Sequence, residues 1–313
     1  MGRARAGRRQ RAEGKRETGL RLKREPCSAS HVCRLPAVLK GGCRMAIDIA
    51  EAVREYDSRR GSLHLFDVNA WLGEQPGPHL AGIETPEGLL EVMDRCHIEQ
   101  AVVTSTTALH AHTGNGNLAV ADALETSDRL VGGYILLPTF TGEQGSTSAP
   151  EAIDRAVDQG FRLFRLFPLS MSFTLDDWCV GDLLAHLQHR RLPLCIWHSE
   201  TTWSHIAGIC HRYPDLPMIV EGSGRKIIYD CRTCYPLLDR HPNLLLELHG
   251  FINYGLMEDF ERRGFAGRVL FGTGMPFVDP DLSLGLIGYA DITAENAARV
   301  AGGTLRGILG GVR

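Results

Sequence analysis

The chain has 313 residues, of which 43% are hydrophobic, so it can form one large α/β domain or two small ones. Its formal net charge of -3 conceals an uneven distribution. Residues 1–44 contain 13 Lys/Arg and three Glu, whereas the rest of the chain contains 21 basic and 34 acidic residues. An acidic body argues against general nucleic-acid binding, and the lack of any apolar run of about 18 residues argues against a membrane helix.

The basic segment, residues 1–44, has almost no aromatic or periodic apolar content, which is typical of disorder. A nucleic-acid arm or an organelle transit segment would share this composition. Met45, however, opens a segment of ordinary composition, so we interpret it as the true initiator and residues 45–313 as the folded domain. Nine cysteines, an odd number in a long chain, favour a reduced cytoplasmic location.

From Ser62 onward, strand-like apolar runs alternate with segments of helical periodicity. The predicted strands are 63–68, 101–105, 130–137, 161–167, 193–197, 217–220, 244–248 and 269–271. The predicted helices are 86–97, 117–127, 150–159, 178–190, 203–212, 227–240, 256–264 and 294–309. Eight such units predict a parallel sheet closed into a (β/α)8 TIM barrel. The rival, a doubly wound open sheet, lacks a Gly-x-Gly-x-x-Gly motif after its first strand.

Polar residues collect where the predicted strands end, which is where barrel enzymes place their active sites. Asp67, Asn69 and Trp71 alternate with Val68 and Ala70, so a period of two predicts that the three share one face. The ends of the later strands carry Arg165, His198, Glu200, Glu221, Ser223, Glu247, His249, Thr273, Met275 and Asp279. This concentration predicts a functional mouth at one end of the barrel.

Five segments, in this order and spacing, resemble the amidohydrolase superfamily. Within it they resemble the amidohydrolase-related metal-dependent hydrolases, which include decarboxylases acting on aromatic or unsaturated acids. The segments are Phe66-Asp-Val-Asn-Ala-Trp71, Gly160-Phe-Arg-Leu-Phe-Arg-Leu-Phe-Pro168, Pro193-Leu-Cys-Ile-Trp-His198, Arg212-Tyr-Pro-Asp-Leu-Pro-Met-Ile-Val220 and Arg268-Val-Leu-Phe-Gly-Thr-Gly-Met-Pro276. The resemblance covers residues 63–309 and implies a hydrolase or related decarboxylase acting on a small organic acid, ester, lactone or amide.

The chain departs from this family at the metal ligands. Typical members hold a divalent cation with His-x-His on strand one, histidines after strands five and often six, and an aspartate after strand eight. Here the corresponding residues are Asn69, Trp71, His198, Gly222 or Ser223, and Gly274. A catalytic zinc site takes three protein ligands, and neither Trp71 nor Gly274 offers one. We therefore expect a degenerate metal site with no metal cofactor, zinc included.

One alternative is a metal site formed by other residues than those at the family's ligand positions. His110-Ala-His112 is the remaining His-x-His motif, and it follows strand two on the mouth side. With His198 and His249 it would form a relocated site, although the resembling family does not use strand two in this way. The Cys231-x-x-Cys234 pair falls in a predicted helix without a second pair, so we interpret both residues as packing cysteines.

Two residues after strand five are the predicted catalytic pair. His198 stands at the family's ligand position, and Glu200 would share its face if the strand continued. A carboxylate that orients an imidazole makes a general acid/base pair. The alternative is that Glu200 is a solvated loop carboxylate.

Two charged residues lie inside apolar strands, Arg165 in the fourth and Glu247 in the seventh. We predict that they form a buried ion pair, since a carboxylate in such a place needs a partner. Alternatively, Arg165 grips a substrate carboxylate, or the Gly222–Gly224 turn accepts an anion.

The sequence therefore predicts a small-molecule enzyme that acts without nucleic acid or membrane. Its substrate-binding residues would be Asn69, Trp71, Arg165, Ser223, Glu247 and His249, and the helical shell would allow a homo-oligomer. The competing hypothesis is a catalytically inactive barrel retained for binding or assembly, because a scaffold can outlive its chemistry.

Overall fold

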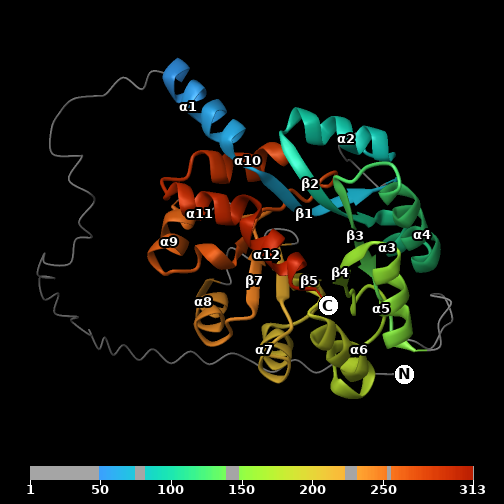
Figure 1. Cartoon of the computed structure of the whole chain (residues 1–313). Coiled ribbons are helices and arrows are strands. Elements are labelled where there is room, and N and C mark those ends of the chain that lie inside the picture. Colours follow the sequence, from blue (N-terminus) through green and yellow to red (C-terminus); the bar gives the residue numbers. More distant parts are fainter. Residues whose placement is uncertain (1–48, 75–81, 139–147, 223–230, 252–254, 313) are drawn as a thin grey trace, which may run out of the picture. The chain divides into compact units, whose positions relative to one another are not determined.

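The computed structural model describes residues 49–74, 82–138, 148–222, 231–251 and 255–312. The basic segment 1–44, the proposed initiator Met45 and the candidate Ser223 lie outside these ranges. Within them, eight parallel strands follow one another around a barrel in chain order (Figure 1). The strands are β1 (Leu65–Leu72), β2 (Ile98–Ser105), β3 (Leu130–Ile135), β4 (Phe161–Arg165), β5 (Leu194–Trp197), β6 (Met218–Glu221), β7 (Leu244–Glu247) and β8 (Val269–Leu270).

The barrel closes between its first strand and the segment that follows its last. Val68 N donates to Phe271 O (3.0 Å), Gly274 N to Asn69 O (2.9 Å) and Trp71 N to Met275 O (2.9 Å). These bonds satisfy backbone groups that an open sheet would leave at its edges. The predicted (β/α)8 barrel is confirmed, and the open-sheet rival is wrong.

Helices surround the strands in the usual alternation (Figure 1). The α-helices are α1 (Ile49–Ser62), α2 (Pro86–Arg95), α3 (Thr106–His110), α4 (Thr113–Leu124), α5 (Ala149–Asp158), α6 (Asp177–Arg190), α7 (Trp203–Arg212), α8 (Cys231–Arg240), α9 (Leu256–Arg262), α10 (Pro280–Gly288), α11 (Ala294–Ala298) and α12 (Thr304–Gly310). Short 3-10 helices span His198–Glu200 and Ala266–Arg268, and a π-helical turn spans Arg299–Gly303. Each described helix is too short or too polar to cross a bilayer.

Local signals explain where several helices begin. The Thr85 hydroxyl accepts a hydrogen bond from Gly88 N at the start of α2, and Pro86 occupies the first turn, where its missing N–H costs nothing. Ser148 caps α5 in the same way, through Glu151 N. The helices α1, α3 and α10 were not among the predicted elements.

The interior of the barrel is filled below the mouth by one apolar layer, which we call the lower layer. It consists of Phe66, Val68, Val102, Leu163, Cys195, Ile219, Leu245, Leu270 and Leu305. All of these side chains are buried, as expected for a barrel whose centre is a packed core rather than a pore. The polar residues at the strand ends therefore rest on an apolar floor.

Candidate functional site

An extra residue in β1 sets the geometry of the mouth. Asp67 pairs with Ala101 and Ala70 pairs with Val103, so three steps along β1 match two along β2. Val68 belongs to the lower layer, whereas Ala70 packs in the cluster between strands and helices. Such a bulge re-aims the side chains that follow it. Asn69 therefore points into the mouth, and the prediction that Asp67 shares its face is wrong.

Asp67 instead joins β1 to the segment after β8. Its carboxylate accepts hydrogen bonds from Asn69 N (2.8 Å), Thr273 N (3.1 Å) and Thr273 Oγ1. Burial raises the pKa of Asp67 to about 6, although the hydrogen bonds from Thr273 and Asn69 oppose that rise. The side chain stabilises the closure of the barrel rather than facing a substrate.

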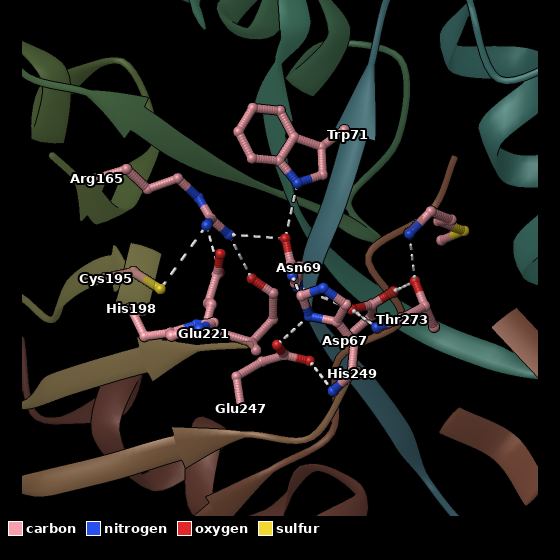
Figure 2. Close-up of polar contacts among 12 residues, drawn as sticks. Asp67, Asn69, Trp71, Arg165, Cys195, His198, Glu221, Glu247, His249 and Thr273 are labelled. Carbon is pink, nitrogen blue, oxygen red and sulfur yellow. Dashed lines mark hydrogen bonds and ion pairs between the residues drawn. The ribbon is translucent and has the colours of Figure 1, made fainter. Parts of the chain in front are cut away.

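Arg165, at the end of β4, extends across the centre of the mouth and is almost completely buried (Figure 2). Its five acceptors are Thr104 Oγ1 (2.8 Å), Cys195 Sγ (3.7 Å), Val68 O (3.0 Å), Asn69 Oδ1 (3.4 Å) and the Glu221 carboxylate. The guanidinium carbon also lies 5.2 Å from the centre of the Trp71 ring. All five N–H donors of the guanidinium are thus engaged.

The charged partner of Arg165 is Glu221, at the end of β6, and the predicted pair with Glu247 is wrong. Burial acts to lower the pKa of Arg165, but the Glu221 carboxylate outweighs it and the pKa is raised. Arg165 therefore stays charged. A substrate carboxylate could bind to it only by displacing one of its present partners.

Glu247 forms a second buried pair, with His249, at the end of β7 (Figure 2). One carboxylate oxygen accepts from His249 N (2.6 Å), and the other bonds to Nδ1 of the ring. Asn69 Nδ2 lies 3.1 Å from the same ring nitrogen. Burial acts to lower the pKa of His249, but the Glu247 carboxylate, helped by Glu221 and Asp67, outweighs it and the pKa is raised. Glu247 thus holds the ring in place and favours its protonated form.

Two glycines after β8 leave the space that this pair occupies. A Cβ at Gly272 would collide with the Glu247 carboxylate, and a Cβ at Gly274 would lie 2.8 Å from Cδ2 of His249. Gly274 also has a φ of 67°, which side chains rarely adopt. At the position where the family resemblance implies an aspartate ligand, His249 fills the space that an aspartate would need.

The predicted catalytic pair, His198 and Glu200, is not assembled as expected. β5 ends at Trp197, and a 3-10 helix follows, so the strand does not continue through Glu200. Both Glu200 oxygens accept from Ser170, from its N (2.8 Å) and from its Oγ (2.6 Å). His198 is buried beside Glu221, with Nδ1 3.3 Å from the Glu221 carbonyl oxygen. Glu200 lines a neighbouring cavity of about 530 Å³ rather than orienting the imidazole.

An aromatic cluster packs around Trp71, the residue whose ring lies against the Arg165 guanidinium. It consists of Trp71, Phe167, Trp197 and Phe277, with ring centres 5.0 to 6.4 Å apart. Trp71 is completely buried, and Phe277 is 39% exposed. Of these four rings, only Trp71 was predicted to line the mouth, because the others follow different strands and no local pattern links them. Glu221 was expected at the end of its strand, but its pairing with Arg165 was not predicted.

The histidines after β2 serve other purposes. His112 Nδ1 accepts a hydrogen bond from Asn115 N (3.1 Å) and so caps α4. His110 lines an apolar cavity of about 400 Å³, and burial lowers its pKa. Across the described ranges, no group of three or more His, Cys, Asp or Glu side chains has the geometry to hold a metal ion.

The donors at the mouth do not fit a divalent cation. Asn69 Oδ1 already accepts from Trp71 Nε1 (2.7 Å) and from Arg165. Gly274 has no side chain, and its space is filled by His249. Three protein ligands, which a catalytic zinc ion requires, are therefore not offered by the described residues that stand at the family's ligand positions.

Comparison with known proteins supports the resemblance seen in the sequence. A family model described as Amidohydrolase matches residues 44–309. No curated protein matches the chain. Among solved structures, an uncharacterised TIM-barrel protein from Bordetella bronchiseptica has a TM-score of 0.64 at 16% identity, covering 80% of this chain and 99% of its own.

Several of the similar structures are decarboxylases. The 2,6-dihydroxybenzoate decarboxylase from Rhizobium has a TM-score of 0.61 at 15% identity and covers 79% of this chain and 99% of its own. The 5-carboxyvanillate decarboxylase from Novosphingobium aromaticivorans, solved with manganese, has a TM-score of 0.61 at 14% identity, covering 80% and 97%. At these identities the likeness shows the fold alone.

Proposed function

Because the chain belongs to the amidohydrolase family, we propose that it is an acid–base enzyme acting on a small organic acid, ester, lactone or amide. The reaction would be a hydrolysis or, as in the decarboxylases with similar folds, a decarboxylation. One observation carries this proposal: the buried Glu247–His249 pair at the mouth of the barrel. A carboxylate that fixes and charges an imidazole is a common arrangement for proton transfer.

His249 is the proposed catalytic residue. Its Nδ1 is held by Glu247, so Nε2 is the ring nitrogen that would exchange a proton with a substrate. In a decarboxylation, the bond to the leaving CO2 breaks, its electron pair stays on carbon, and that carbon takes the proton from Nε2. In a hydrolysis, the neutral ring would accept a proton from the attacking water. The raised pKa of His249 favours the first role near neutral pH.

Two further features would act on the substrate. Asn69 lies against the His249 ring, with Nδ2 3.1 Å from Nδ1, and would limit the movement of the ring by contact. The aromatic cluster presents the partly exposed Phe277 next to Trp71 and Trp197, a surface that suits a flat, unsaturated molecule. No divalent metal takes part in the proposed reaction, because the residues at the ligand positions do not fit one.

The test is a panel of carboxylic acids, esters, lactones and amides, assayed with and without EDTA. We expect turnover that EDTA leaves unchanged and that His249→Gln reduces about 10²- to 10⁴-fold in kcat. His211→Gln, which changes an exposed histidine on α7, is the matched control and should behave as the parent. Activity that survives His249→Gln would overturn the role of His249, and inhibition by EDTA would overturn the metal-free reaction.

The inactive barrel is a second candidate, favoured by a different observation. The centre of the mouth is filled by Arg165, whose donors are all engaged, and by the completely buried Trp71. A filled centre suits a binding protein at least as well as an enzyme. This candidate predicts ligand binding without turnover across the whole panel, and any turnover abolished by His249→Gln would exclude it.

A further inference from the structure

We infer that the guanidinium of Arg165 is the built-in cation of this barrel, supplying the positive charge that typical members of the family obtain from a divalent ion. The side chain is neither an ordinary surface arginine nor a vacant anion receptor. It is a fixed charge at the centre of the mouth, bound to groups from four other strands. Its role concerns charge balance and does not depend on turnover.

The need for a cation follows from the carboxylates. Asp67, Glu221 and Glu247 are all completely buried at the mouth. A buried carboxylate without a partner is costly, so each requires a positive charge or several donors. Asp67 has donors from Thr273, and Glu247 has His249. Glu221 forms its direct ion pair with Arg165, the one ion pair found for this carboxylate among the described residues.

The guanidinium also connects strands as a bound ion would. From β4 it bonds to Val68 and Asn69 of β1, Thr104 of β2, Cys195 of β5 and Glu221 of β6. Asn69 stands where the resemblance implies the first histidine ligand, and its Oδ1 accepts from Arg165. Arg165 therefore occupies Asn69 Oδ1, the oxygen that this position would offer to a metal ion.

The same arrangement opposes the binding of a divalent ion. A second cation placed beside the guanidinium would be repelled across a few ångströms of poorly screened interior. It would also have to displace Arg165 from Asn69 Oδ1 and from the Glu221 carboxylate, because both already accept hydrogen bonds from the guanidinium. We therefore attribute the absence of a metal ligand set among the described residues of the mouth to Arg165, whose guanidinium occupies the oxygens and supplies the positive charge.

The first experiment uses the native protein. We expect far less than one equivalent of zinc, manganese or iron per chain by elemental analysis after purification without chelators. We also expect no shift in Tm with MnCl2 or ZnCl2 at about 1 mM, because an ion that binds only the folded state would raise Tm. One tightly held ion per chain, or a clear rise in Tm, would overturn the assignment of Arg165.

The second experiment removes the guanidinium and returns it in solution. Arg165→Ala should lower Tm by about 10 °C or more, because Glu221 loses its charge partner. Guanidinium chloride at low millimolar concentration should restore part of the loss, whereas urea, its neutral isostere, should restore none. Equal effects of guanidinium and urea would mean that space, not charge, was lost, and would overturn the inference.

Arg129→Ala is the matched control for chemical rescue. Arg129 also makes several hydrogen bonds, to Asp94 and to two backbone carbonyls, but it lies at the surface at the other end of the strands. Guanidinium chloride should not raise the Tm of this variant. A rise equal to that of Arg165→Ala would show that the effect is general and would contradict the inference.

A third variant covers the case in which Arg165→Ala does not fold. Arg165→Met combined with Glu221→Gln removes both charges at once and leaves no buried carboxylate uncompensated. Its Tm should lie above that of Arg165→Met alone. A double variant that is no more stable than the single one would show that Arg165 does not serve the charge of Glu221.

Discussion

The lower layer and the mouth are built by the same eight strands, yet different physical rules hold them together. In the lower layer, apolar side chains such as Leu163 and Leu245 fill space, and any of similar size would serve. In the mouth, two residues higher, each buried charge has a specific partner: Arg165 with Glu221, and His249 with Glu247. The lower layer should therefore tolerate substitution by other apolar side chains, whereas the stability of the mouth depends on its ion pairs.

The largest expected effect comes from breaking a pair in the mouth. Glu221→Leu leaves the Arg165 guanidinium buried without its counter-charge, and we expect a loss of about 3 to 5 kcal/mol in the free energy of unfolding. Urea titration followed by circular dichroism measures it. Leu163→Ile in the lower layer is the comparison and should cost less than about 1.5 kcal/mol. Equal costs would erase the distinction between the two regions.

The next effect concerns pH. The pKa of Asp67 in the folded protein, about 6, lies above its ordinary value of 3.8, so the folded state holds this proton more tightly than the unfolded chain. The stabilising effect is complete below about pH 4 and is lost as the pH rises through about 6. Relative to Asp67→Asn, which cannot titrate, the parent should lose about 2 kcal/mol between pH 4.5 and 7. Parallel curves for the two proteins would contradict the raised pKa.

A smaller effect tests the space beside His249. Gly274→Asp introduces the carboxylate that the family resemblance implies, but it forces a Cβ against the imidazole ring. We expect a loss of about 1 to 3 kcal/mol and no gain in manganese binding, because the ring must move first. Thermal unfolding with and without MnCl2 measures both. A variant that binds manganese without loss of stability would show that the mouth still accommodates the ion.

The smallest effect is expected at Glu200. Ser170→Ala removes one of the two hydrogen bonds that fix the Glu200 carboxylate and should cost about 1 kcal/mol. Any activity found in the panel should change less than with His249→Gln, since Glu200 is not bound to either ion pair of the mouth. A larger loss of activity with Ser170→Ala than with His249→Gln would indicate that Glu200 takes part in catalysis.

The barrel could be predicted because its signals are local. Apolar runs marked each strand, and the observed bounds differ by a few residues, as in 244–248 against Leu244–Glu247. Capping residues such as Thr85 marked helix starts. The cytoplasmic location, the oligomeric state, the initiator at Met45 and the small-molecule substrate stay predictions.

The mouth was harder to predict because its partners come from distant strands. We predicted Glu247 as the partner of Arg165, but Glu221 also stands at a strand end, and periodicity does not say which carboxylate faces the guanidinium. The bulge after Asp67 changes which side chains face inward without changing composition. The prediction that Glu200 shares a face with His198 was wrong for a similar reason. No residue near Glu200 indicates that a 3-10 helix, rather than a continued strand, follows β5.

The bulge in β1 separates two sets of residues that have different neighbours. Residues before it, including Phe66 and Val68, belong to the lower layer, and those after it, including Asn69 and Trp71, belong to the mouth. Exchanges at positions 69 and 71 can therefore alter what the barrel presents to a ligand while the lower layer keeps its packing. Ala70 and Leu72 pack between strands and helices, so an engineer who wishes to give this scaffold a new chemistry would begin at Asn69 and Trp71.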